Sequence, residues 1–371
     1  DGDSREFFDL EEFTDRRDNK YRASITIAHG CDNFCSYCIV PYVRGRFLSR
    51  PGAEILREVR SLVESGAKEI TLLGQNVNSY GNDFGSGYGF AALLRDVART
   101  DGVELVRFVT SLPQDFTEEI AQVMASEPNV CPSVNLPIQA GSDRILKLMN
   151  RRYTRAEYMD KVRMLRGFLP DLGLSSDLIV GFPGETEQDF EDSMSALREI
   201  RFDLLHSAAY SEREGTPAAA MPGSLPQEVR YERLNRLNRL QDEITLSINR
   251  TLVGRRYRIL VDAPASKSQG FLQGRTPTDK VVLFEGRDEL LGCFVMVEIV
   301  EAESWCLRAR VVLPCGPINF SGVQDQILGV KKGAGWDVEG ALVETSYGLL
   351  FRCRYGMFSD GWAFGSGSSV L

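Results

Sequence analysis

The sequence has few of the residues that mark several common classes of protein. It holds only 8 cysteines in 371 residues, too few for the disulfide framework of a small secreted domain. No run of 18 apolar residues occurs, so we expect no membrane-spanning helix and no membrane partner. Residues 1–5 contain neither a basic segment nor an apolar core, which is not the pattern of a secretory signal. The formal net charge is −9, which argues against passive polyanion binding but not against RNA binding through a local basic face.

The composition is that of a globular protein, with 43% hydrophobic and 26% charged residues. Residues 1–20 are charged and irregular, and we expect a linker there. After them, short apolar segments that predict strands alternate with amphipathic segments that predict helices. The predicted strands are 23–28, 69–73, 105–110, 133–137, 174–180 and 204–209. The predicted helices are 53–64, 90–99, 117–126, 143–149, 155–168 and 186–199. This alternation predicts an α/β fold, a partial (β/α) barrel over residues 21–249 with its active face at the strand C-termini.

The chain changes character after a predicted helix over residues 227–249. Short strands with glycine and aspartate turns follow and predict a small all-β barrel over residues 250–312. These strands are expected at 257–261, 270–274, 280–284, 293–300 and 305–311. Residues 250–311 hold ten basic and eight acidic side chains, which favours RNA contact in a chain that is acidic overall. Residues 313–371 contain 11 of the 34 glycines, and this tail is left unassigned.

Three cysteines fall within eight residues, directly after the first predicted strand. Cys31, Cys35 and Cys38 form a C-x3-C-x2-C triplet that begins after Gly30. Three thiolates on one loop can hold three irons of a [4Fe–4S] cluster and leave the fourth iron open. The open iron is what S-adenosylmethionine (SAM) needs to bind before one electron cleaves it to a radical. The alternatives are a Cys3His zinc site that uses His29, or three ordinary core thiols.

Six ordered sequence blocks resemble the radical SAM methylthiotransferases, in particular the MiaB-type tRNA methylthiotransferases. They are residues 31–46, 49–51, 73–81, 136–142, 177–186 and 210–216. The resemblance implies a radical SAM barrel followed by a TRAM domain, a small β-barrel that binds RNA. It also implies methylthiolation of isopentenyl-adenosine beside the tRNA anticodon, with a [4Fe–4S] cluster and SAM as cofactors.

The resemblance implies roles for several residues near strand ends. Cys31, Cys35 and Cys38 are the expected metal ligands, and no further catalytic residue is assigned. Five residues are expected to bind SAM: Tyr37, Gln75, Asn76, Gln139 and Asp177. Gln75 and Asn76 occupy the place that holds the SAM amino group, and Tyr37 lies near the adenine. The alternatives are a polar turn for the first pair and simple loop packing for Tyr37.

The chain also departs from the family pattern. The family holds an auxiliary [4Fe–4S] cluster with three cysteines of an N-terminal domain, and we expect this chain to be a fragment or an incomplete enzyme that lacks it. The remaining cysteines are scattered, at positions 131, 293, 306, 315 and 353. Asn135 and Leu112 stand where family members often have histidine, on the substrate side.

Basic residues suggest where RNA would lie. Arg44, Arg46 and Arg50 follow the cysteines, and eight basic residues lie between 144 and 166. Either group would contact phosphates or form a solvated surface.

We therefore expect a cytoplasmic enzyme that acts on tRNA and takes electrons from a flavodoxin-like reductant. The alternatives are methylthiolation of threonylcarbamoyl-adenosine in tRNA or of a ribosomal-protein aspartate, and a non-catalytic RNA-binding remnant.

Overall fold

The computed structural model describes residues 19–85, 87–265, 270–315, 343–344 and 350–351. The chain divides into two units, Asp1–Cys315 and Gly316–Leu371. In the second unit the described residues are β14 (Val343–Glu344) and β15 (Leu350–Phe351), which pair antiparallel. Most of the predicted N-terminal linker, and of the unassigned tail, lies outside the described residues.

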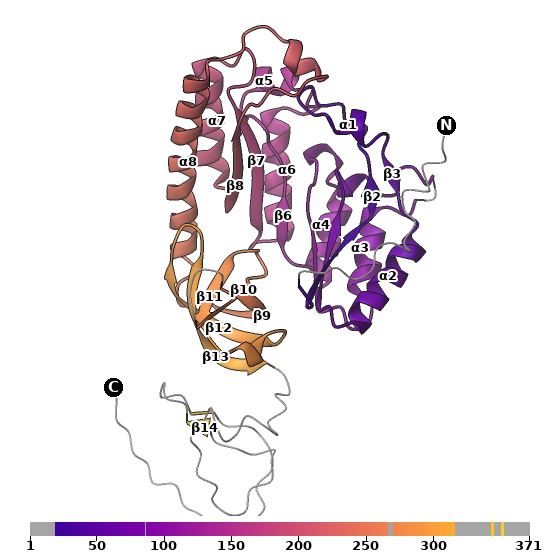
Figure 1. The fold of residues 1–371 in the computed structure, drawn as a ribbon, viewed down its shortest axis with the longest axis vertical. Helices are drawn as coiled ribbons and strands as arrows, with labels where there is room; N and C mark the ends of the chain where they lie inside the picture. Colours follow the sequence, from indigo (N-terminus) through magenta and orange to yellow (C-terminus); the bar gives the residue numbers. More distant parts are fainter. Residues whose placement is uncertain (1–18, 86, 266–269, 316–342, 345–349, 352–371) are drawn as a thin grey trace, which may run out of the picture. The chain divides into compact units, whose positions relative to one another are not determined.

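Six parallel strands form the frame of the first unit, in two three-stranded sheets (Figure 1). The first sheet has the order β1 (Arg22–Thr26), β4 (Glu69–Leu73), β5 (Leu105–Phe108). The second has the order β6 (Ser133–Asn135), β7 (Gly173–Val180), β8 (Leu204–Ala209). A parallel bridge between Val106 and Val130 continues β5 toward the segment that leads into β6. The predicted α/β fold with a partial (β/α) barrel is confirmed.

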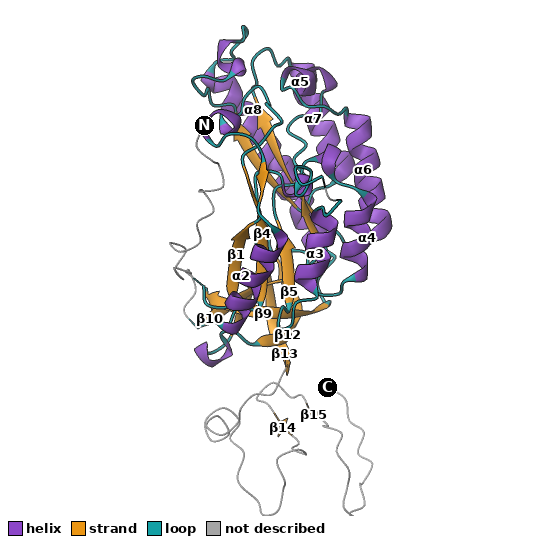
Figure 2. Ribbon diagram, turned by 90° about the vertical axis from the view of Figure 1, so that its right-hand side faces the viewer, coloured by secondary structure: helices purple, strands orange, loops and turns teal. Residues whose placement is uncertain are grey.

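Helices follow the strands and cover one face of the sheets (Figure 2). They are α2 (Gly52–Glu64), α3 (Phe90–Ala98), α4 (Glu118–Ser126), α5 (Asp143–Leu148), α6 (Arg155–Phe168) and α7 (Glu187–Ile200). Four begin after a Ser or Thr whose side chain accepts a hydrogen bond from the first turn, at Thr117, Ser142, Thr154 and Thr186. Such caps satisfy backbone donors that have no partner within the helix and so define where each helix starts.

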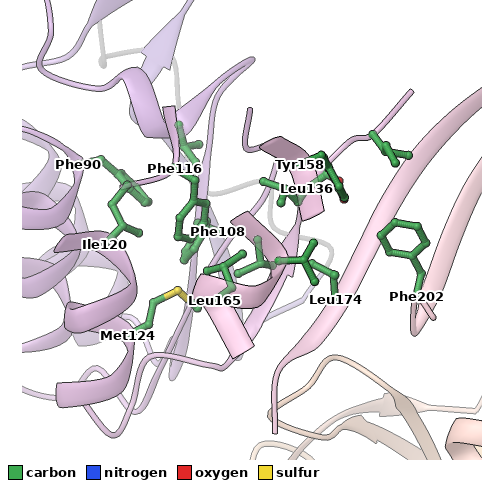
Figure 3. Close-up of a cluster of buried hydrophobic side chains, with 14 of the residues drawn as sticks. Phe90, Phe108, Phe116, Ile120, Met124, Leu136, Tyr158, Leu165, Leu174 and Phe202 are labelled. Atoms are coloured by element: carbon green, nitrogen blue, oxygen red, sulfur yellow. The ribbon is translucent and has the colours of Figure 1, made fainter. Parts of the chain in front are cut away.

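The barrel core lies between the strands and these helices (Figure 3). The Phe90 and Phe108 rings meet edge to face with centroids 5.1 Å apart, and Phe116 is fully buried beside them. Burying one such side chain contributes about 1.5–3 kcal/mol. Along β7, side chains are alternately buried and half-buried, so one face of the strand points to this core and the other to the barrel interior.

A long helix connects the barrel to a second, smaller core. Helix α8 (Gln227–Arg250) precedes a closed barrel with the strand order β10-β11-β13-β12-β9. Its strands are β9 (Arg256–Pro264), β10 (Phe271–Arg275), β11 (Val281–Glu285), β12 (Phe294–Ala302) and β13 (Leu307–Cys315). The predicted small all-β barrel is confirmed, with its own buried cluster around Ile259, Phe284 and Val297.

Buried ion pairs join the two barrels at the N-terminal ends of the parallel strands. The Glu69 carboxylate accepts hydrogen bonds from Arg22 (2.6 Å) and Arg107 (3.1 Å), and its residue is only 2% exposed. Arg22 also binds Asp262 of β9 at 2.8 Å, and Arg107 donates to the Thr276 carbonyl at 2.9 Å. The β-barrel is therefore attached to the end of the α/β barrel that lies opposite the strand C-termini.

Several short elements are absent from the sequence prediction. They are β2 (Ala28–His29), α1 (Val40–Val43), β3 (Leu48–Ser49) and four 3-10 turns at Val77–Ser79, Pro113–Asp115, Pro217–Ala220 and Asp288–Leu290. Elements of two to four residues carry too little periodicity to be recognised from the sequence. No helix in the described part of the chain is both long enough and apolar enough to span a membrane.

Candidate functional site

The cysteine triplet lies on a loop whose two ends are paired. Strand β2 pairs with β3, Ala28 opposite Ser49 and His29 opposite Leu48, and closes the loop at its base. Gly30 has φ +73°, and a Cβ at this position would lie 2.0 Å from the Arg46 carbonyl oxygen. Glycine is needed here because the backbone is left-handed and the segment around Arg46 passes directly over it.

The three thiols are half-buried, and two of them receive hydrogen bonds from neighbouring side chains. Asn33 Nδ2 donates to Cys31 Sγ at 3.3 Å, and Arg151 Nη1 donates to Cys35 Sγ at 3.5 Å. Burial raises the pKa of the Cys38 thiol, and the nearby Cys35 and Cys31 sulfurs raise it further. Binding to iron would remove this penalty, because a coordinated thiolate shares its charge with the metal.

The chemistry of the three thiols is compatible with a [4Fe–4S] cluster. Within the described ranges, no three His, Cys, Asp or Glu side chains come together to hold one metal ion. Each thiolate of a [4Fe–4S] cluster binds a different iron, so the three sulfurs need not converge on one point. The zinc alternative with His29 therefore has no support in the described residues.

The segment between the cysteines is attached to helix α5. Ser36 Oγ donates to the Leu148 carbonyl at 2.8 Å, and Ser36 N donates to the Met149 carbonyl at 3.0 Å. Tyr37 packs against the barrel core, and burial raises the pKa of its hydroxyl well above the usual value. The loop thus has a fixed position at the C-terminal end of the strands.

Arg151 is a site residue that the sequence interpretation missed. It was grouped with the basic residues between 144 and 166, but its guanidinium points inward. Besides Cys35, it donates to the Tyr153 hydroxyl at 2.9 Å and to the Pro137 carbonyl at 3.1 Å. It also lies over the Tyr153 ring, 5.1 Å from its centroid. A fixed cation beside one sulfur would offset negative charge at that position.

Other members of the basic group bind protein acceptors as well. Arg144 binds Asp189, Arg155 binds Glu199 at 2.8 Å, and Lys161 donates to the Phe116 carbonyl at 2.6 Å. These members of the group therefore take part in packing within the protein, while Lys147 and Arg152 are exposed. Arg50 is 2% exposed and binds Glu58 at 2.8 Å, so it is not at an RNA surface.

Unpartnered polar atoms gather after β4 and β5. Asn76 Nδ2 donates to Asp115 Oδ2 at 2.6 Å, but Asn76 Oδ1 and Gln75 Oε1 are buried without a hydrogen-bond partner. Both amide atoms of Asn78 and the Ser111 hydroxyl are also buried and unpartnered. Buried polar atoms nearly always have partners, so this group is a candidate binding surface. Asn78 and Ser111 were not predicted, because asparagine and serine near turns carry no specific sequence signal.

Gln139 and Asp177 lie on the second sheet. Gln139 has φ +66° and bridges β7 through its backbone, donating to the Asp177 carbonyl at 2.8 Å. Burial raises the pKa of the Asp177 carboxyl. A hydrogen bond from Asn135 (3.3 Å) and the nearby His206 partly offset this rise. His206 pairs with Asp177 in the register of β7 and β8, so both side chains face the barrel interior.

The Radical SAM superfamily profile matches residues 25–197, and the TRAM domain profile matches residues 250–312. The fold and these matches define a radical SAM protein with a C-terminal TRAM domain, whose cofactors are a [4Fe–4S] cluster and SAM. The tRNA-2-methylthio-N(6)-dimethylallyladenosine synthase of Moorella thermoacetica is 47% identical over 303 residues, which are 82% of this chain and 68% of that protein. The synthase of the same name from Acetivibrio thermocellus is 47% identical over 80% of this chain and 62% of that protein. The chain therefore belongs to the tRNA-2-methylthio-N(6)-dimethylallyladenosine synthases, a family of radical SAM methylthiotransferases.

Eight relatives of this name share 43–47% identity with the chain. The chain spans 61–68% of the length of these relatives.

Proposed function

We propose that this chain carries out the SAM-dependent radical step in methylthiolation of isopentenyl-adenosine beside the tRNA anticodon. The observation that carries the proposal is the group of three half-buried thiols on one closed loop at the strand C-termini. The identity to relatives named for this reaction supports the choice of substrate over threonylcarbamoyl-adenosine or a protein aspartate.

Cys31, Cys35 and Cys38 would each bind one iron of the cluster. When bound, the cluster supplies the electron that cleaves SAM to a radical able to remove hydrogen from the adenosine. The Asn33 and Arg151 hydrogen bonds to the sulfurs would stabilise added negative charge and so adjust the reduction potential.

SAM would lie along the strand ends beside the cysteine loop. The unpartnered oxygens of Gln75 and Asn76 would accept hydrogen bonds from its amino group. Tyr37 would pack near the adenine, and Gln139 and Asp177 would bind from the second sheet. Binding in this way would satisfy polar atoms whose burial is otherwise unfavourable.

The β-barrel would hold the RNA, with its exposed basic residues making phosphate contacts that position the anticodon stem. The electron would come from a flavodoxin-like reductant. We infer a reducing, cytoplasmic location, because free thiols persist in such a compartment.

The experiment is anaerobic reconstitution of the full chain with iron and sulfide, followed by iron counting and EPR with and without SAM. We expect about four irons per chain and a spectrum that SAM perturbs. About eight irons would contradict the assignment of a single cluster. Reduced enzyme should form 5′-deoxyadenosine from SAM, and this product reports the radical step.

Cys35→Ala tests the ligand assignment. Cluster assembly needs all three thiolates, so we expect loss of the SAM-sensitive EPR signal and of 5′-deoxyadenosine. Cys293→Ala is the matched control, because this half-buried cysteine lies in the β-barrel between the 3-10 turn Asp288–Leu290 and β12. Equal 5′-deoxyadenosine formation by Cys35→Ala and Cys293→Ala would refute the cluster site.

A further inference from the structure

A carboxylate holds the side-chain amide of Asn76 in one orientation. Asn76 Nδ2 donates to Asp115 Oδ2 at 2.6 Å and to Ser79 Oγ at 2.6 Å, so both of its hydrogens have acceptors. The Ser79 hydroxyl in turn donates to the same Asp115 oxygen at 3.0 Å. A carboxylate can only accept hydrogen bonds. Turning the amide over would place its oxygen against the carboxylate, so Asp115 directs Asn76 Oδ1 away from itself.

The amide oxygen that is held in this way has no donor within the protein. Asn76 is 1% exposed, and its Oδ1 is buried without a hydrogen-bond partner among the described residues. Gln75 Oε1, one position earlier, is buried and unpartnered as well. Buried acceptors without a partner are unfavourable, and a bound donor removes the penalty. Two neighbouring acceptors of this kind match a ligand that carries an N–H donor, such as the amino group of SAM.

The turn that carries Asp115 also contacts the cysteine loop. Asp115 is the last residue of the 3-10 turn that follows β5. Gln114, next to it, donates from Nε2 to Asn33 Oδ1 at 2.9 Å. Asn33 is the residue whose amide donates to Cys31 Sγ. The same short turn is therefore bonded to the loop of the proposed cluster and to Asn76, which is proposed to bind SAM.

The backbone is strained where it enters this turn. Thr110 has a φ of +67°, in the left-handed region that is unfavourable for a β-branched residue. Its carbonyl accepts a hydrogen bond from Val77 N at 3.1 Å, which joins the end of β5 to the 3-10 turn after Asn76. Strain of this kind is found preferentially at functional sites, where the surroundings impose it. The bend brings Asp115 to Asn76 across 39 positions of the sequence.

We propose that Asp115 is a positioning residue for SAM, which acts through Asn76 by turning the amide oxygen toward the amino group of the cofactor. The inference rests on the proposed function, because it requires SAM to bind beside Gln75 and Asn76. Asp115 transfers no proton: it removes one of the two orientations of an amide whose oxygen and nitrogen ends have nearly the same size. With an amide in place of this carboxylate, either group can donate to the other, so Asn76 Oδ1 faces SAM for only part of the time.

The test measures SAM binding to the reconstituted full chain by anaerobic equilibrium dialysis. Asp115→Asn keeps the shape of the side chain. Glu118→Gln is the matched control, because it removes an exposed carboxylate three positions further along. The competitor 5′-methylthioadenosine, which lacks the amino group, is measured in the same way. We expect Asp115→Asn to raise the dissociation constant of SAM about fivefold or more, because a charged acceptor becomes a neutral one. The dissociation constant of 5′-methylthioadenosine, the iron content and the control variant should remain unchanged.

A double-mutant cycle with Asn76→Ala tests the path of the effect. If Asp115 acts through Asn76, then Asp115→Asn should weaken SAM binding no further once the amide is gone. Additive losses would overturn the proposal, as would an unchanged dissociation constant of SAM in Asp115→Asn. Loss of iron from Asp115→Asn, or equal weakening of SAM and 5′-methylthioadenosine, would also overturn it, because Asp115 would then support the site as a whole. Failure of the proposed function is seen separately, as absence of SAM binding and of 5′-deoxyadenosine in the reconstituted wild-type chain.

Discussion

Glu69→Gln should destabilise the junction between the two barrels. The Glu69 carboxylate is buried and bridges two guanidinium groups, Arg22 at 2.6 Å and Arg107 at 3.1 Å. Glutamine has nearly the same shape, so the substitution removes the charge without leaving a cavity. The two arginines then remain at the junction with less compensating charge.

The expected loss of stability depends on the hydrogen-bond acceptors that each arginine retains in the variant. Removing one partner of a buried ion pair costs about 3–5 kcal/mol. Arg22 keeps Asp262 at 2.8 Å, and Arg107 keeps the Thr276 carbonyl at 2.9 Å. Because both retain a good acceptor, we expect the free energy of unfolding to fall by about 3 kcal/mol, the lower end of that range.

The assay is urea unfolding followed by circular dichroism, with Glu104→Gln as the matched control. Glu104 and Arg258 also join the two barrels, at 2.9 Å, but their side chains are 46% and 43% exposed. An exposed pair of this kind contributes about 0–1 kcal/mol. If Glu69→Gln and Glu104→Gln lowered the free energy of unfolding equally, burial would not be what makes the Glu69 network important.

Two further predictions concern the site and its support. Gly30→Ala should abolish cluster assembly, measured as iron per chain, because the added Cβ would meet the Arg46 carbonyl. Gly45→Ala is the control: Gly45 has a similar φ of +72° but open space around it, so this variant should retain iron. Retention of iron by both variants would contradict the close approach. Asp189→Asn should lower the free energy of unfolding by about 1–3 kcal/mol at pH 7. Burial raises the pKa of Asp189, but hydrogen bonds from Arg144 and its neighbours outweigh this effect and lower the pKa. The Asp189 carboxylate therefore stabilises the folded state above the unfolded pKa of about 4. This stabilisation is lost as the pH falls through the lower pKa of the folded state. A difference from wild type that does not shrink in acid would refute this linkage.

Much of the fold could be predicted because its elements repeat a local pattern. The strand at 69–73 and the helix at 155–168 were predicted with the bounds that the structure has. Their apolar spacing and the Thr154 cap act within a few residues and can be read from the sequence. The cysteine triplet is equally local, since all three proposed ligands lie on one loop.

What the sequence alone determined is therefore the order of the elements and the identity of the three thiols, because both depend on neighbours along the chain. The tertiary structure decided which distant residues meet them. Arg151 reaches Cys35 across 116 positions, and Glu69 binds Arg107 across 38. Asn78 and Ser111 become buried and unpartnered only where the ends of two strands are brought together. Such contacts depend on how the strands pair and how the barrel closes, and no local propensity specifies either.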